Sequence, residues 1–490
     1  MKILFLSSEM APFAKTGGLG DVVGSLAGAV RALGHEVSVF LPRYRSVDIQ
    51  KLELETAIDY FELIIGNQLE ATRVFLKKLD SGVKVYFIEH PDYFMREELY
   101  GTLVGDYQDN DRRFTYFQRA ALKAAEKLKL APDIVHCHDW QTGLVPAYLK
   151  TPEISSASLR KARSVFTIHN LAYQGNFPPD SFPATGLGWE FYKPDLLEFY
   201  GKFSFLKGGL VFADAVTTVS ERYSREIQTK ELGCGMEGVL AARKDSVTGI
   251  INGIDPKDWD PATDADIDAK YDLKDLSGKK LSKAALQKEH NFKVDPSIPL
   301  LGFVARLVDQ KGLDILVPVL EQLSQQQDVQ MVILGTGEDQ YHQVLRDFAK
   351  KNKKWFGVHI LFDPKMAKRI YAGSDMMLIP SHYEPCGLGQ IIGLRFGSIP
   401  VVRATGGLAD TIQNFEPVSQ KGNGFLFEDY TSEALHTVLL RSVKIFKQEK
   451  LWKALMKNAM GSDFSWDASA KKYEKLYESV KRRPIKTEKI

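Results

Sequence analysis

Short apolar runs alternate with amphipathic stretches along most of the 490 residues. Such alternation predicts α/β domains with doubly wound parallel sheets, which bind ligands at the carboxyl ends of their strands. In the first half the predicted strands are residues 3–6, 37–41, 83–88, 134–137, 164–168 and 215–219. In the second half they are residues 300–305, 329–334, 359–362, 376–379 and 399–402.

The pattern breaks near residue 250, where a polar segment rich in aspartate begins. A chain of 490 residues is also too long for one hydrophobic core. We therefore expect a Rossmann-like N-terminal domain over residues 1–250 and a second Rossmann-like domain over residues 251–465. The amphipathic segment 466–490 is predicted to contain a helix that crosses back to the first domain.

A glycine-rich turn, residues 15–21, follows the first predicted strand and opens an amphipathic stretch. The N–H groups of Gly17 and Gly18, the positive end of a helix dipole and the charge of Lys15 would together suit a phosphate or diphosphate. The alternative is a tight turn without a ligand. A second Thr-Gly-Gly-Leu, beginning at Thr405, follows a strand of the second half, which favours two domains acting on one ligand.

Two cations and one acid are predicted at the ligand edge of the second sheet. Arg306 follows the strand 300–305, and Lys311 lies at the start of the next helical stretch. A helix dipole contributes at most ~2 kcal/mol to an anion, so a departing diphosphate requires further positive charge. Glu384 follows strand 376–379 and could bind a sugar hydroxyl or counter developing positive charge. The alternatives are a solvated cation pair and a helix-capping acid.

Histidines end two strands of the first half, in His136-Cys137-His138-Asp139 and in His169-Asn170. A zinc site lacks an identifiable third ligand, so polar contacts to a sugar are favoured, with Trp140, Tyr107 or Tyr173 as ring surfaces. Asp-x-Asp pairs at residues 109–111 and 264–266 could hold a divalent cation, but matches this short are common by chance. We expect neither a metal nor another cofactor.

Composition narrows the class of protein further. The formal net charge of +2 argues against nucleic acid as the main partner. Three distant cysteines favour a reducing compartment over a disulfide framework, and no apolar run reaches the 18 or more residues of a membrane span. We therefore expect a cytoplasmic protein without a membrane partner, although a mature plastid protein would have the same features.

These motifs together resemble bacterial glycogen synthase and plant starch synthase. The residues that carry the resemblance are Lys-Thr-Gly-Gly-Leu at 15–19, His-Asp-Trp at 138–140, His-Asn at 169–170, Asn-Gly-Ile-Asp at 252–255, Arg306 with Lys311, Glu-Pro-Cys-Gly-Leu at 384–388 and Thr-Gly-Gly-Leu at 405–408. The resemblance covers the whole chain. It implies a GT-B fold, with an active-site cleft between the two domains. It also implies metal-free, retaining transfer of glucose from ADP-glucose to the non-reducing end of an α-1,4-glucan.

The resemblance also assigns roles to residues. Arg306 and Lys311 would stabilise the diphosphate leaving group, while Glu384 and His169 would hold the transferred glucose. The donor site would be completed by Lys15, Gly17, Gly18, Asp139, Asn170, Asn252, Phe362, Cys386, Gly387, Leu388 and Thr405. Tyr107, Asp109 and Asn110 would lie near the acceptor. Phe362 stands where relatives often have a tyrosine that stacks on the base, so stacking should survive without the hydroxyl.

Three other functions are weighed against this one. A nicotinamide-dependent oxidoreductase would need the dinucleotide fingerprint, which the spacing of glycines at residues 17, 18 and 20 does not match. A non-catalytic glucan-binding protein would leave the Arg306 and Lys311 pair unexplained. UDP-glucose remains an alternative donor, because the spacing of these residues does not distinguish the base.

Overall fold

The computed structural model describes residues 1–102, 104–326 and 328–484. The chain folds as two compact units. The first contains Met1–Ile250 and the segment that begins at Trp466, and the second contains Ile251–Ser465. Residues 485–490 of the predicted C-terminal segment lie outside the described residues. No described helix has both the length and the apolar character needed to cross a membrane.

The first unit is built on one mixed sheet with strand order β14-β13-β9-β8-β1-β2-β5-β4-β3. Its strands are β1 (Lys2–Leu6), β2 (Glu36–Pro42), β3 (Glu55–Ile65), β4 (Gln68–Lys78), β5 (Lys84–Glu89), β8 (Ile134–His138), β9 (Arg163–Ile168), β13 (Ala215–Thr218) and β14 (Val247–Gly249). The six strands predicted from the pattern are confirmed within one or two residues at each end.

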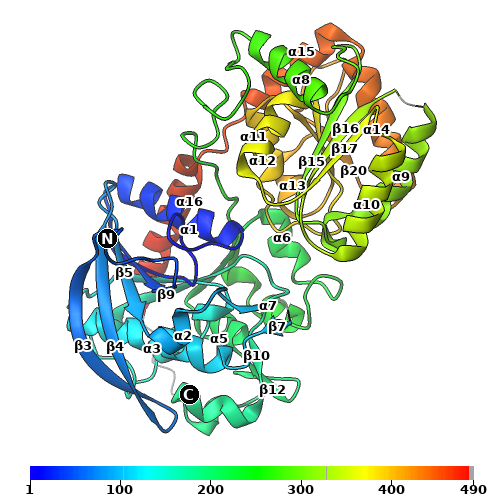
Figure 1. The fold of residues 1–490 in the computed structure, drawn as a ribbon. Coiled ribbons are helices and arrows are strands. Elements are labelled where there is room, and N and C mark those ends of the chain that lie inside the picture. The colour runs from blue at the N-terminus through cyan, green and yellow to red at the C-terminus, as the bar shows by residue number, and fades with distance from the viewer. Residues whose placement is uncertain (103, 327, 485–490) are drawn as a thin grey trace. The chain divides into compact units, whose positions relative to one another are not determined.

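An antiparallel hairpin at one edge departs from the predicted all-parallel sheet. β3 pairs with β4, and β4 with β5, in antiparallel register, and Figure 1 shows the long hairpin at the margin of the first unit. Tyr60 and Ile64 of β3 are exposed, so the strand lacks the continuous apolar run by which a buried strand is recognised. The sequence pattern missed it for this reason.

Helices cover both faces of this sheet. The side chains of β1 alternate, with Ile3 and Phe5 in one core cluster and Leu4 and Leu6 in another. The first cluster includes α1 (Gly18–Ala32) and α16 (Trp466–Arg482), which lie side by side in Figure 1. The remaining helices of this unit are α2 (Pro91–Phe94), α3 (Asn110–Lys127), α4 (Val145–Tyr148), α5 (Phe205–Phe212), α6 (Glu221–Glu226) and α7 (Glu237–Ala242).

The second unit has a parallel sheet with strand order β17-β16-β15-β18-β19-β20, which is the doubly wound order. Its strands are β15 (Leu300–Val304), β16 (Gln330–Gly335), β17 (Phe356–Ile360), β18 (Met376–Ile379), β19 (Ile399–Arg403) and β20 (Phe425–Phe427). The predicted strand 359–362 is displaced. β17 ends at Ile360 because the Asp363 side chain accepts hydrogen bonds from the N–H groups of Lys365 and Met366 and thereby starts the next helix.

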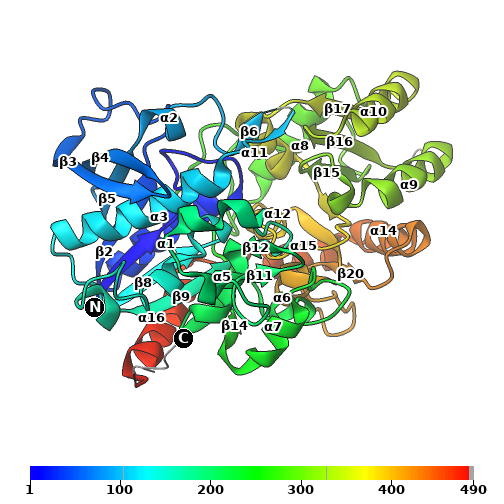
Figure 2. The ribbon, with the colours of Figure 1, turned by 90° about the horizontal axis from the view of Figure 1, so that it is seen from below.

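Two sets of helices enclose this sheet (Figures 1 and 2). One face carries α9 (Leu313–Gln326), α10 (Asp339–Lys351) and α14 (Ser432–Phe446), and the other α8 (Ser277–Glu289), α11 (Pro364–Gly373) and α12 (Gly389–Arg395). The short α13 (Gly406–Thr411) follows β19, and α15 (Glu449–Met460) packs against α12 and α14. Chain direction along the sheet reverses at β15, which places the topological switch point between β15 and β18.

Candidate active site

The switch point of the second unit brings together the two loops that follow β15 and β18. They line a cavity of about 70 Å³ together with the carboxyl ends of both strands. Lys311, Ser381 and Glu384 line this cavity, and the backbone of residues 387–389 closes it. Ligands of doubly wound sheets bind at this place.

An ion pair joins the two loops. Nζ of Lys311 lies 2.5 Å from Oε2 of Glu384, and the Oγ of Ser381 donates to the same oxygen at 3.0 Å. The side chains of Lys311 and Glu384 are only 16% and 9% exposed. Because an ammonium has three donors, Lys311 can keep this contact and still donate to a phosphate oxygen.

Gln310 holds the neighbouring cation. The exposed Arg306 donates to Oε1 of Gln310 at 3.3 Å, while Nε2 of Gln310 donates to the carbonyl of Tyr383 at 3.2 Å. The carbonyl of Gln310 in turn accepts the N–H of His382 at 2.9 Å. This glutamine, which the sequence reasoning did not single out, therefore fixes the separation of the two loops. Its position between the two predicted cations was the available signal.

The second Thr-Gly-Gly-Leu shapes the loop that carries Glu384. A Cβ on Gly406 would stand 2.0 Å from the carbonyl oxygen of Glu384, and one on Gly407 would stand 2.0 Å from that of Cys386. The N–H of Gly407 also donates to the Glu384 carbonyl at 3.0 Å. These glycines thus allow a close backbone approach, and Thr405 is the N-cap residue of α13.

Three further predicted donor-site residues belong to this unit. Asn252 is buried and hydrogen-bonds the thiol of Cys386, while its own Oδ1 has no partner among the described residues. Burial raises the pKa of Cys386 to about 12, so the thiol stays protonated and is no nucleophile. Phe362 follows β17 with a ring that is 77% exposed and accessible for stacking.

The glycine-rich turn of the first unit already holds an anion from its own chain. The buried Glu9 carboxylate accepts the N–H of Thr16 at 2.7 Å and that of Gly17 at 3.4 Å. Lys15 pairs with Asp21 at 2.8 Å on the surface. The Gly17 N–H is therefore shared with Glu9, whereas the role of Lys15 and of Gly18 at the start of α1 stays a prediction. The overlooked signal was Glu9, an acid three residues after the end of strand β1.

Asp139 and His169 meet at the carboxyl ends of β8 and β9. Oδ1 of Asp139 accepts the N–H of His169 at 2.7 Å, and the N–H of Asn170 also bonds this carboxyl. Asp139 adopts a φ of 56°, a left-handed conformation that is strained for a residue other than glycine. Residues in such conformations cluster at functional sites, so Asp139 stays a candidate site residue.

We expect Asp139 to make stability depend on pH. Burial, with a smaller contribution from Glu9, raises the pKa of Asp139 to about 7, against ~3.9 in an unfolded chain. The folded protein thus holds one proton more between these values, so stability falls as pH rises from 4 through 7, by up to ~1.4 kcal/mol per unit. Asp139→Asn removes this slope. Melting temperatures at pH 5 and pH 8 should show the variant gaining on the wild type at pH 8. The exposed Asp59→Asn serves as control, and an equal difference at both pH values would contradict the assignment.

The predicted acceptor residues are bound into their own loop. Asp109 forms two hydrogen bonds with Arg96, at 2.7 and 2.6 Å, and the guanidinium groups of Arg96 and Arg113 lie 4.6 and 4.9 Å from the centre of the Tyr107 ring. Asn110 is buried, and its amide bonds Arg113 and the carbonyl of Tyr100. The Tyr107 ring and the Asp109 carboxylate are both only half-buried, whereas Asn110 is buried.

Several other predicted ligand contacts are structural. Trp140 is buried against Phe114 and Phe205, so it is a core residue and not a sugar platform. Asp264 and Asp266 both pair with Lys368. Within the described residues, no group of three or more His, Cys, Asp or Glu side chains could hold a metal ion.

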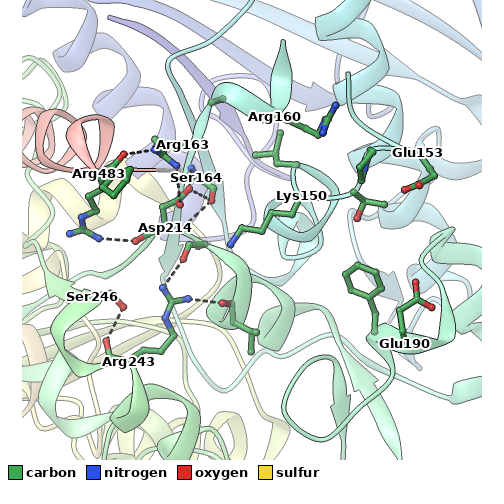
Figure 3. A pocket seen from close by; sticks show the side chains of 18 of the residues that line it. Lys150, Glu153, Arg160, Arg163, Ser164, Glu190, Asp214, Arg243, Ser246 and Arg483 are labelled. Carbon is green, nitrogen blue, oxygen red and sulfur yellow. Dashed lines mark hydrogen bonds and ion pairs between the residues drawn. The ribbon is translucent and has the colours of Figure 1, made fainter. Parts of the chain in front are cut away.

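A larger cavity of about 1220 Å³ lies elsewhere in the first unit (Figure 3). Arg163, the first residue of β9, and Asp214, directly before β13, line it at the sheet edge opposite His169. Figure 3 shows Arg163 next to Asp214 and Arg243 reaching the backbone. Arg243 donates to carbonyls at the end of α5. Arg163 thus pairs with Asp214 at the starts of β9 and β13, and Arg243 satisfies carbonyls at the end of α5.

Two doubly wound units, with Arg306 and Lys311 at the switch point of the second, are the features of a GT-B glycosyltransferase. Comparisons with known proteins agree. Residues 2–242 match the family model of the starch synthase catalytic domain, and residues 283–459 match that of glycosyl transferases group 1. The chain is 43% identical to a glycogen synthase of Koribacter versatilis over 98% of its length and 99% of the relative's. It is 45% identical to that of Syntrophotalea carbinolica over 97% and 98%.

A solved structure agrees over the same range. The catalytic domain of starch synthase IV from Arabidopsis thaliana, bound to ADP and acarbose, superposes with a TM-score of 0.89 at 35% identity. The match covers 98% of this chain and 99% of that domain. The chain therefore belongs to the glycogen synthase and starch synthase family. This confirms the resemblance and the GT-B fold predicted from the sequence, and makes the protein a glucosyltransferase.

Proposed function

We propose that this protein transfers glucose from ADP-glucose to the non-reducing end of an α-1,4-glucan, with retention of configuration. The contact between Lys311 and Glu384 at the β15–β18 switch point is the observation that carries the proposal. The contact supports the proposal because Lys311 would neutralise a leaving diphosphate while the neighbouring Glu384 binds the sugar that the diphosphate leaves. The relative bound to ADP and acarbose, an adenine nucleotide and an oligosaccharide analogue, supports the same donor and acceptor classes.

In this proposal the second unit is the donor side. Arg306 and Lys311 neutralise charge on the diphosphate as the glycosyl bond breaks, and Phe362 stacks on the base. Glu384 and the backbone of Cys386, Gly387 and Leu388 hold the glucose, with Asn252 and Thr405 completing the site. No metal is required, because side-chain cations supply the positive charge.

The first unit is the acceptor side and also supplies contacts to the transferred glucose. His169 donates to a glucose hydroxyl, and Asp139 fixes the backbone of His169 and Asn170. Lys15 and Gly18 approach the donor phosphate beside the Gly17 N–H that Glu9 holds, while Tyr107, Asp109 and Asn110 form the loop near the glucan. The three cysteines are free, which supports a cytoplasmic location.

One assay tests the donor and the reaction together. Purified protein is incubated with ADP-glucose or UDP-glucose, with and without glycogen, and nucleoside diphosphate release is measured. We expect ADP release that depends on glycogen, with UDP release at least about tenfold slower. NMR of the elongated glucan should show new α-linkages. Faster UDP release would establish the alternative donor, and no release from either would indicate a glucan-binding protein.

A further inference from the structure

Three histidines meet where β8 and β9 end in the first unit. His136 and His138 lie on the same face of β8 because they are two residues apart, and His169 follows β9. Both ring nitrogens of His136 are bonded, Nδ1 to the Tyr477 hydroxyl at 2.7 Å and Nε2 to the Thr167 hydroxyl at 2.6 Å. His136 therefore has no nitrogen left for a metal or a substrate.

The other two histidines share one hydrogen bond. Nδ1 of His138 lies 3.0 Å from Nε2 of His169. The His138 ring is fully buried, and its Nε2 has no hydrogen-bond partner among the residues that the structure describes. His169 is half-buried, and its Nδ1 is the nitrogen that His138 does not occupy.

The hydrogen bond between His138 and His169 contains one proton, and the burial of the two rings determines which of them is the donor. Desolvation lowers the pKa of His136, His138 and His169, so all three rings are neutral near pH 7 and carry one proton each. If His169 donated from Nε2, the proton of His138 would sit on Nε2 as a buried, unpaired N–H. If His138 donates from Nδ1, only a lone pair is left unpaired, which costs less than an orphaned donor.

We propose that His138 is a positioning residue that donates from Nδ1 to Nε2 of His169 and thereby fixes His169 as the Nδ1–H tautomer. His169 then offers a ligand one N–H donor and no basic nitrogen. Such a group binds an oxygen lone pair, and it takes no proton from a hydroxyl. The functional consequence rests on the proposed glucosyl transfer: His169 would bind a sugar oxygen without acting as a general base.

The tautomer can be observed without any substrate. Protein labelled with ¹⁵N-histidine is studied by long-range ¹H–¹⁵N correlation, which distinguishes protonated from unprotonated ring nitrogens, and His169→Gln assigns the signals. We expect a protonated Nδ1 and an unprotonated Nε2 for His169. A protonated Nε2 on His169 would overturn the proposal, even if the protein proves not to be a transferase.

Three variants separate positioning from packing. His138→Phe retains an aromatic ring at this position but removes the N–H donor, so His169 should lose its fixed tautomer. The value of kcat/KM should then fall roughly threefold to tenfold, as for one lost neutral hydrogen bond. His138→Asn retains a donor near the position of Nδ1 and should restore most of that loss. His136→Phe, a buried change on the same strand face, should leave the His169 tautomer unchanged. An unchanged tautomer in folded His138→Phe would contradict the proposal. If transfer is absent from the wild type but the tautomer is as expected, the proposed function fails and the role of His138 stands.

Discussion

Lys311→Ala is expected to lower kcat by about 10²–10³-fold, the loss typical of one preorganised group that stabilises transition-state charge. The wild-type ammonium lies 2.5 Å from Glu384 in a largely buried pair, so solvent screens it little. Without the Lys311 ammonium, the diphosphate would leave next to the Glu384 carboxylate, which would keep the hydrogen bond from the Ser381 hydroxyl. Arg306→Ala should reduce kcat in the same direction.

The measurement is kcat and KM for ADP-glucose with saturating glycogen, together with a thermal melt. A control is Lys365→Ala, which removes a lysine that is 78% exposed and lies 3.9 Å from Asp266 at the start of α11. We expect the control to retain nearly full turnover. A Lys311→Ala enzyme that turns over at close to the wild-type rate would refute the leaving-group role.

Lys279→Met is expected to destabilise the second unit by about 1.5–3 kcal/mol, the usual worth of buried hydrogen bonds from a charged donor. Its Nζ donates to the carbonyls of Ala372 and Ser374 at 3.2 and 3.0 Å, and to that of Phe396 at 2.9 Å. These carbonyls lie at the carboxyl ends of α11 and α12. Removing the ammonium leaves them buried without its hydrogen bonds at the negative ends of two helix dipoles.

Differential scanning calorimetry should resolve this effect, because a protein of two units need not unfold in one step. The melting of the second unit should shift downward by several degrees. The matched control is Lys280→Met, since Lys280 is the exposed neighbour on the same helix. Equal shifts in melting temperature for the two variants would show that the hydrogen bonds of Lys279 do not stabilise the second unit. The outcome also bears on activity, because α12 begins directly after the loop that carries Glu384.

Much of the site could be predicted because parallel sheets impose a simple rule. Arg306 and Glu384 each follow a strand that the apolar pattern identified, and in a parallel sheet such positions fall at one edge. The ion pair between Lys311 and Glu384 agrees with that placement. The prediction failed where a strand is half-exposed, as in the β3–β4 hairpin, and where a helix cap decides the end of a strand, as at Asp363.

By itself the sequence determined most of the parallel strands, the family and the loops that bear the candidate residues, because periodicity and short motifs are local properties of the chain. Only the tertiary structure decided that Glu9 accepts the N–H groups of Thr16 and Gly17, that Trp140 belongs to the core, and that His138 contacts His169. Those facts depend on side chains from different strands and loops meeting at distances near 3 Å, and no local pattern of residues encodes such a meeting.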